Sequence, residues 1–182
     1  MTGRGRRGAK PPPSKRKAPP GLKDVQRIRR STHNALLALF YHFVWGTKHR
    51  EPLIAPEWEG SLHNAIAAKV AELGAFVHAV GGTDDHVHLV ASVPPKIALS
   101  TFIGQVKGNS SHFVNHVLNT GAQFAWQAEY GVVSFGGKML HMATEYAKSQ
   151  RKHHAEGRTI AMLEQIEPEE KRGPGLRENA RG

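Results

Sequence analysis

The sequence predicts an α+β fold in which helices pack on an antiparallel β-sheet. Segments with strand character and segments with helical periodicity alternate along the chain in the order β-α-β-β-α-β-α. A short turn rich in glycine joins the second and third strands, which is typical of an antiparallel hairpin. These two observations predict one compact sheet with its helices packed on it, and a last helix that follows the final strand.

The first half of the pattern consists of a strand, a helix and a second strand. Residues 35–45 are mostly apolar or aromatic and are predicted as a central strand. Residues 57–74 have helical periodicity and end at Gly74, a residue favoured where a helix stops. Residues 75–80 form the second predicted strand, and residues 81–84 form the turn after it. The side chains expected along one side of the helix are Trp58, Leu62, Ile66, Val70 and Leu73.

The second half begins with a strand over residues 85–93, which the pair Pro94-Pro95 ends. Residues 98–118 are predicted as the second helix, residues 130–135 as the last strand and residues 138–154 as the final helix. This order of elements is that of a ferredoxin-like sandwich. The side chains expected to be buried on the second helix are Phe102, Ile103, Val106, Phe113, Val114 and Val117.

The formal net charge of +10 is concentrated at the start of the chain. Residues 1–30 hold eleven Lys and Arg and one Asp, whereas basic and acidic residues balance in the rest of the chain. We therefore divide the chain into a basic tail (1–32), a folded domain (33–160) and a C-terminal tail (161–182). The basic tail could be an electrostatic arm for phosphates, a solubilising tail or an over-extended start.

The composition also bears on the compartment. The chain contains no cysteine, which excludes disulfides and thiolate metal sites and suits a reducing environment. No apolar segment approaches the length needed to span a membrane, and the N-terminus lacks the hydrophobic core of a signal peptide. We therefore expect a cytoplasmic protein without a membrane partner.

The strand over residues 85–93 contains the spacing His-x-His. Alternate side chains on a strand point to the same face, so His86 and His88 share one face while Val87 and Leu89 share the other. Two imidazoles in this arrangement can converge on one metal ion. The alternative is a pair of histidines that only form hydrogen bonds on the sheet.

The final helix contains a second spacing of interest, Tyr-x-x-x-Gln. Residues four apart lie one above the other on a helix, so Tyr146 and Gln150 project from the same face. Placed downstream of His-x-His, this pair offers a phenol nucleophile and a third neutral metal ligand beside it.

These motifs resemble the single-tyrosine HUH transposases, which include insertion-sequence transposases that act on single-stranded DNA and REP-associated tyrosine transposases. The resemblance covers roughly residues 33–160, the predicted folded domain. Five segments in the same order carry it: residues 41–50, 85–90, 107–111, 126–131 and 146–150.

The resemblance implies that His86, His88 and Gln150 bind a divalent metal ion, Mg²⁺ or Mn²⁺, and that Tyr146 is the catalytic nucleophile. The implied reaction cleaves and rejoins single-stranded DNA that bears a hairpin, through a 5′-phosphotyrosine. No nucleotide cofactor is expected, because the phosphotyrosine keeps the energy of the broken bond. The resemblance also allows a homodimer.

Basic side chains outside the tail are candidates for DNA binding: Lys48, Arg50, Lys107 and Arg151, which could equally be ordinary surface charges. Tyr41 and Tyr130 are competing nucleophiles, but both lie among aromatic residues and are better explained by core packing. Three other functions are alternatives: another HUH enzyme (a replication initiator or relaxase), a non-catalytic or domesticated nucleic-acid-binding module on the same fold, and a structural metal site.

Overall fold

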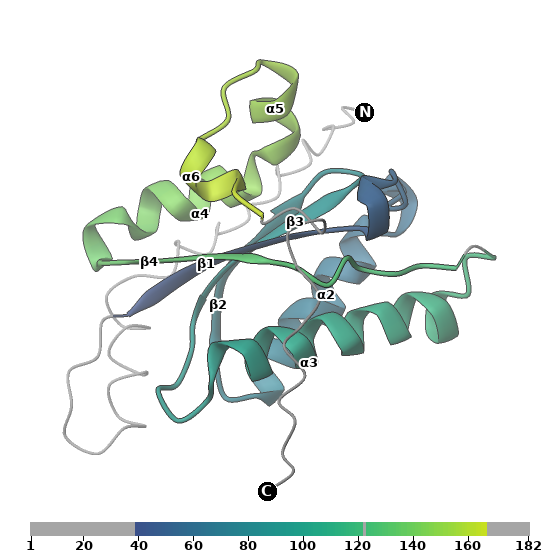
Figure 1. Cartoon of the computed structure of the whole chain (residues 1–182), viewed down its shortest axis with the longest axis horizontal. Helices are drawn as coiled ribbons and strands as arrows, with labels where there is room; N and C mark the ends of the chain where they lie inside the picture. Colours follow the sequence, from purple (N-terminus) through teal and green to yellow (C-terminus); the bar gives the residue numbers. More distant parts are fainter. Residues whose placement is uncertain (1–38, 122, 167–182) are drawn as a thin grey trace, which may run out of the picture. The chain divides into compact units, whose positions relative to one another are not determined.

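The computed structural model describes residues 39–121 and 123–166. The basic tail predicted over residues 1–32, the start of the first predicted strand and the C-terminal residues 167–182 lie outside the described residues. The described residues form a four-stranded antiparallel sheet with the order β2-β3-β1-β4 (Figure 1). The strands are β1 (Phe40–Gly46), β2 (Phe76–Gly82), β3 (His86–Ser92) and β4 (Gly131–Phe135).

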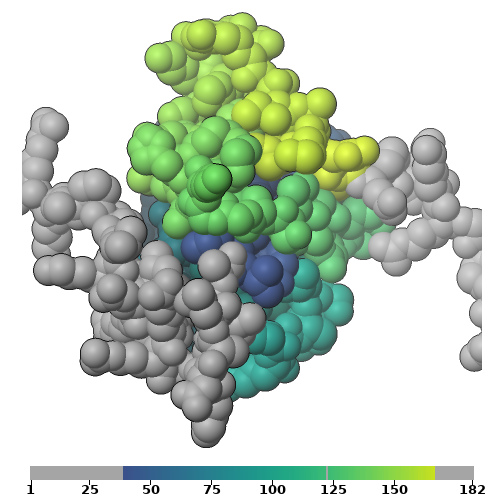
Figure 2. Space-filling model, turned by 90° about the vertical axis from the view of Figure 1, so that its left-hand side faces the viewer, coloured from purple at the N-terminus to yellow at the C-terminus, as the bar shows by residue number. Residues whose placement is uncertain are grey.

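Helices cover both faces of this sheet. α2 and α3 lie against one face, and α4, α5 and α6 lie over the other (Figure 1). Figure 2 shows the second group from the side, in green to yellow, as a layer over the sheet. This arrangement confirms the predicted α+β fold, a ferredoxin-like sandwich with helices packed on an antiparallel sheet. The helices are α2 (Pro56–Glu72), α3 (Leu99–His112), α4 (Leu140–Lys148), α5 (Gln150–Ala155) and α6 (Ala161–Glu164).

The central strands β1 and β3 give the sheet two different faces, because their side chains alternate. Toward α4 they present three histidines, His42, His86 and His88, all of them buried. Every residue of β3 is buried, since helices cover this strand on both sides. The apolar residues on the opposite face, toward α2 and α3, include Phe43, Trp45, Val87, Leu89 and Ala91.

Two glycines allow helices to approach the sheet at backbone distance. A Cβ atom at Gly81 of β2 would lie 1.9 Å from the carbonyl oxygen of Ala147 in α4. A Cβ atom at Gly131 of β4 would lie 2.0 Å from the carbonyl oxygen of Gln165, directly after α6. Only a residue without a side chain leaves room for these contacts. Gly81 and Gly131 therefore determine where α4 and α6 lie on the sheet.

The second predicted helix, residues 98–118, changes its geometry near its end. Its α-helical part ends at His112, and the chain continues as a π-helix over Phe113–Leu118. A π-helix has a wider turn than an α-helix, so side chains leave the α-helical register. Val114 is buried, but Val117 is 64% exposed. The prediction that Val117 faces the core is therefore wrong.

The final predicted helix, residues 138–154, is divided into two. α4 ends at Lys148, Ser149 has φ −106° and ψ 22°, and α5 begins at Gln150. These angles lie outside the α-helical range. The side-chain Nε2 of Gln150 donates a hydrogen bond of 3.0 Å to the carbonyl of Tyr146, so a side chain bridges the break. Within the described part of the chain, no helix is long and apolar enough to cross a membrane.

Candidate active site

His86 and His88 lie on the face of β3 that α4 covers, with exposures of 1% and 0%. Their ring centroids are 4.9 Å apart. Nδ1 of His86 lies 2.5 Å from Oδ1 of Asp85 and 2.8 Å from the hydroxyl of Thr83. Nδ1 of His88 lies 2.9 Å from Nε2 of His42. Both Nε2 atoms are buried and have no hydrogen-bond partner. The shared face that His-x-His spacing predicts is present, and Nε2 of each ring makes no hydrogen bond.

The Asp85 carboxylate fixes the ring of His86. Burial would raise the pKa of Asp85, but hydrogen bonds with His86 and Thr83, together with the charges of His86 and Arg50, lower it to about 2. Asp85 is therefore ionised at neutral pH and accepts the proton on Nδ1 of His86. Arg50 forms an ion pair with this carboxylate, since its Nε lies 3.0 Å from Oδ2 of Asp85.

His42 of β1 contacts Nδ1 of His88 in the way that Asp85 contacts Nδ1 of His86. The sequence did not identify His42 as a site residue. It is 1% exposed, and burial, with a further contribution from His88, lowers its pKa to about 3. A neutral His42 can accept the Nδ1 proton of His88 on its own Nε2. The signal in the sequence was a polar residue at an alternate position of an otherwise apolar strand.

Tyr146 of α4 lies directly beside these rings. Tyr146 is 3% exposed, and the centroid of its ring lies 5.9 Å from that of His88 in an edge-to-face arrangement. Its hydroxyl donates to Oε1 of Glu164 and accepts a hydrogen bond of 2.9 Å from the backbone N–H of Ile160. Burial raises the pKa of Tyr146 to about 12, and the hydrogen bond to the Glu164 carboxylate contributes. The phenol is therefore protonated at neutral pH.

Gln150, the other half of the Tyr-x-x-x-Gln pair, is also buried, with 1% exposure. Its amide nitrogen is engaged by the carbonyl of Tyr146, and its Oε1 is buried without a hydrogen-bond partner. The amide oxygen is therefore available as an acceptor or a ligand.

Glu164 of α6 is the second site residue that the sequence did not reveal. Its Oε2 lies 3.6 Å from Nε2 of His86, 3.4 Å from Nε2 of His88 and 3.6 Å from Nε2 of His154. Burial would raise the pKa of Glu164, but its contacts with His88 and Tyr146 lower it to about 2. The residue belongs to the stretch that the sequence analysis assigned to the C-terminal tail. No local pattern distinguished it from the neighbouring acidic residues.

The described residues present a group that could hold a metal ion. His86, His88 and Glu164 each offer one ligand atom, and these atoms lie within 4.8 Å of one another. Burial lowers the pKa of His88 although Glu164 opposes this effect, so the ring is available as a neutral ligand. Imidazole nitrogens and amide or carboxylate oxygens suit divalent ions such as Mn²⁺. The residues fit such an ion, and the assignment of Gln150 as the third ligand stays a prediction.

The predicted DNA-binding residues lie in different surroundings. Lys48 and Arg50 are exposed in a single 3-10 turn at the end of β1, and Nη2 of Arg50 lies 3.4 Å from Nδ1 of His86. Arg151 of α5 pairs with Glu59 of α2 at 2.9 Å. It borders a groove of about 490 Å³ lined by α2, β2 and the junction of α4 and α5, with Lys148 and Lys152 also on its border.

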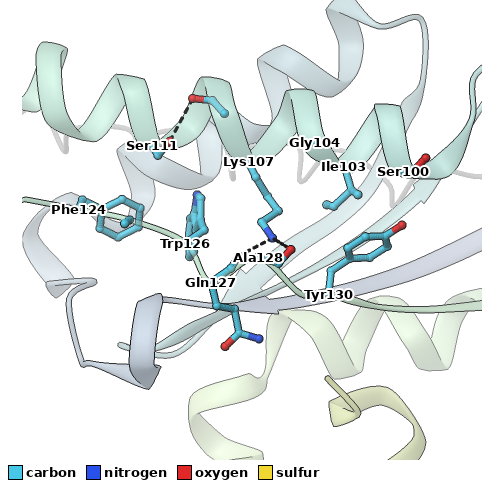
Figure 3. Close-up of a pocket in the computed structure, with 12 residues that line it drawn as sticks. Ser100, Ile103, Gly104, Lys107, Ser111, Phe124, Trp126, Gln127, Ala128 and Tyr130 are labelled. Atoms are coloured by element: carbon cyan, nitrogen blue, oxygen red, sulfur yellow. Dashed lines mark hydrogen bonds between the residues drawn. The ribbon is translucent and has the colours of Figure 1, made fainter. Parts of the chain in front are cut away.

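Lys107 of α3, in contrast, is 9% exposed. Its ammonium donates hydrogen bonds to the backbone carbonyls of Gln127, Ala128 and Glu129, at 2.7, 2.9 and 3.1 Å, and Figure 3 draws the first two. Burial lowers its pKa to about 8. The side chain thus holds the segment before β4 against α3, beside a groove of about 410 Å³ (Figure 3).

The two competing tyrosines pack against the apolar core on the α2–α3 side of the sheet. Tyr41 and Tyr130 are both partly buried hydrophobic neighbours of that core. The ring of Tyr41 lies 6.0 Å from that of Phe43. Neither tyrosine belongs to the cluster around His86 and His88.

Known proteins resemble this chain in sequence and in fold. The ISDra2 transposase TnpA of Deinococcus radiodurans is 32% identical over 73 residues, which are 40% of this chain and 52% of that protein. The chain thus matches about half the length of this curated relative. A crystal structure from Deinococcus radiodurans R1, of a protein assigned as a transposase, has a TM-score of 0.52 and 19% identity. The match covers 72% of this chain and 98% of that one.

A second solved structure, a REP-associated tyrosine transposase bound to a REP hairpin, has a TM-score of 0.49 and 13% identity over 70% of this chain and 74% of the other. The family model described as "Transposase IS200 like" matches residues 35–150, a range that includes the His-x-His strand and the Tyr146–Gln150 pair. Since this match spans more than half of the sequence, the chain belongs to the family of IS200-like transposases.

Proposed function

We propose that this transposase cleaves and rejoins single-stranded DNA with Tyr146 as the nucleophile, and that His86, His88 and Gln150 hold a divalent metal ion, Mg²⁺ or Mn²⁺. The observation that carries the proposal is one buried cluster: a phenol beside two imidazoles whose Nε2 atoms lack partners. The third unpartnered atom, Oε1 of Gln150, belongs to the residue one turn beyond the phenol. Family membership supports the same assignment.

The reaction conserves the number of phosphate ester bonds. The Tyr146 oxygen attacks phosphorus, an O–P bond to the phenol forms, and the bond to the 3′-oxygen breaks. The products are a 5′-phosphotyrosine and a free 3′-hydroxyl, and attack by a 3′-hydroxyl reverses the step. No nucleotide cofactor is required for rejoining.

The side chains around Tyr146 have separate tasks in this proposal. A divalent ion would supply positive charge against the negative phosphate, which otherwise repels an incoming phenolate. Neutral ligands such as His and Gln would leave that charge undiminished. The edge-to-face contact with His88 and the hydrogen bond from Ile160 orient the phenol. The pKa of about 12 means that Tyr146 must lose its proton as the new bond forms.

The substrate we propose is a single strand that bears a hairpin, which rests on family membership. The groove lined by α2, β2 and the junction of α4 and α5, with Lys148, Arg151 and Lys152 on its border, is the path we propose for the strand. Lys48 and Arg50 would contact phosphates on the other side of His86. Lys107 is assigned to holding the segment before β4 and not to DNA.

The decisive experiment uses Tyr146→Phe, which keeps the ring and removes only the hydroxyl. The parent protein, incubated with labelled hairpin-bearing single strands and Mn²⁺, should form a covalent adduct that survives denaturing electrophoresis and maps to Tyr146 by mass spectrometry. Tyr146→Phe should form no adduct, because the attacking oxygen is absent.

Tyr130→Phe is the matched control, since it removes a hydroxyl outside the cluster and should leave adduct formation intact. An adduct in Tyr146→Phe that maps to Tyr41 or Tyr130 would show that another tyrosine is the nucleophile. If the parent forms no adduct on any hairpin tested, the protein is better described as a nucleic-acid-binding module on this fold.

A further inference from the structure

α6 is anchored over the site and is not a loose end of the chain. Leu163 in its middle is 2% exposed. The backbone N–H of Ile160, which precedes the helix, donates to the Tyr146 hydroxyl, and the carbonyl of Gln165 after it lies directly over Gly131. Contacts on both sides of α6 therefore hold this helix, and with it Glu164, over the sheet; Figure 1 shows α6 above β1 and β4.

The distances around Glu164 are close to those between ligands of one ion. Its Oε2 lies 3.6 Å from Nε2 of His86 and 3.4 Å from Nε2 of His88. Both nitrogens are buried atoms without a hydrogen-bond partner. Around an ion with bonds of about 2.1 Å, neighbouring ligand atoms are about 3.0 to 3.4 Å apart. The His88–Glu164 distance lies at the upper end of this range and the His86–Glu164 distance just beyond it, and all three ligand atoms lie within 4.8 Å of one another.

The proton positions point the same way. Nδ1 of His86 faces the Asp85 carboxylate, which can only accept, so the His86 proton lies on Nδ1 and the lone pair on Nε2. Nδ1 of His88 faces His42, so the same arrangement is available to His88. The Nε2 atoms of two imidazoles and one carboxylate oxygen then face a common space, an arrangement that a divalent cation between them would stabilise.

We infer that Glu164 is itself a ligand of the divalent ion, in addition to His86, His88 and Gln150. This inference rests on the metal site of the proposed function and adds to it a carboxylate from beyond the end of the family match. The second oxygen of the same carboxylate accepts the Tyr146 hydroxyl. One side chain thus links the metal site to the nucleophile, and binding of the ion is coupled to the docking of α6.

The test is the affinity for Mn²⁺ of the full chain without DNA, measured by calorimetry and by the electron paramagnetic resonance signal of free Mn²⁺. Glu164→Gln should weaken Mn²⁺ binding by about tenfold or more, because it removes a charged ligand while keeping the shape. Glu145→Gln on α4 removes the same charge from an exposed carboxylate and should leave the affinity unchanged. Thermal unfolding of the metal-free proteins checks that both variants fold.

Amide hydrogen exchange gives a second readout. Mn²⁺ should slow exchange at the amides of Leu163 and Glu164 in the parent, because the ion would hold α6 in place, and it should not do so in Glu164→Gln. Exchange in α6 that does not respond to Mn²⁺ in the parent would contradict the inference.

The outcomes separate this inference from the proposed function. If the parent binds Mn²⁺, His88→Ala abolishes binding and Glu164→Gln binds as the parent does, Glu164 is not a ligand although the metal site stands. If the parent binds no Mn²⁺, both proposals fail. Faster adduct formation by Glu164→Gln at unchanged Mn²⁺ affinity would make Glu164 a competitor of the DNA phosphate and would also overturn the inference.

Discussion

At the scale of single residues, a neighbouring side chain outside the His-x-His motif determines which ring nitrogen of each histidine carries the proton. Asp85 holds the proton of His86, and His42 is placed to hold that of His88. Such partners set which ring nitrogen is free, and their loss commonly weakens metal sites even though they touch no metal. The choice of Nε2 in both rings is thus encoded by residues outside the His-x-His motif.

Lys107 gives a prediction about pH at this scale. Its pKa is 10.5 in an unfolded chain and about 8 in the folded protein. Between these values the unfolded chain binds more protons, so the contribution of Lys107 makes the free energy of unfolding rise with pH across this window. Lys107→Met should remove that rise, as measured by urea unfolding at several pH values from about 7 to 10.

Lys96→Met, at an exposed position, is the control and should keep the pH dependence of the parent. If Lys107→Met shows the same pH dependence as the parent, the ammonium is not held in the buried position that the three carbonyls define.

At the scale of elements, the position of Tyr146 depends on how closely α4 approaches β2. The contact at Gly81 is between backbones, so it fixes the distance between the sheet and the helix that carries Tyr146, the proposed nucleophile. A helix supported by side chains could adjust when one of them changes, but a backbone contact offers no such freedom.

Gly81→Ala should therefore displace α4, since the new Cβ atom would lie 1.9 Å from the carbonyl oxygen of Ala147. We expect a loss of about 1 to 3 kcal/mol in the free energy of unfolding, measured with urea, and reduced adduct formation by Tyr146. Gly104→Ala on α3 is the matched control, because no atom lies within 4 Å of its added Cβ.

Gly104→Ala should be neutral or stabilising by up to about 1 kcal/mol, as expected for alanine in place of glycine in a helix. Equal stability of Gly81→Ala and the parent would mean that α4 can move away from β2 at little cost.

At the scale of the whole molecule, the hydrophobic periodicity of the sequence predicted the strands, the helices and the faces on which their side chains lie. Alternation along residues 85–93 correctly placed His86 and His88 on one face, and the element order predicted the sheet and its helices. The break at Ser149 and the π-helix at residues 113–118 were not predicted, because tertiary contacts impose them on sequences with ordinary helical periodicity. Glu164 was missed because only the folded chain brings α6 to β3.

The charge distribution leads to a prediction about the complete chain, although residues 1–30 lie outside the described residues. Deleting them removes a net charge of +10. If they contact phosphates, the deletion should weaken binding of single-stranded DNA and flatten the dependence of log affinity on log salt, while the cleaved bond stays the same. A fluorescence anisotropy titration at several salt concentrations measures this slope, and an unchanged slope would favour a solubilising tail or an over-extended start.

The alternation along β3 also governs how the protein tolerates sequence change. Val87 and His88 are neighbours in the chain. Val87 packs in the apolar core against α2 and α3, whereas His88 lies on the opposite face, beside Tyr146 of α4. In a saturation mutagenesis library, harmful substitutions along this strand would fall into two alternating classes. Changes at Val87 and Leu89 would lower the yield of folded protein, whereas changes at His86 and His88 would leave the yield and remove the activity. A thermostable variant can accordingly be sought on the α2–α3 side of the sheet, one residue away from the face that carries the proposed site.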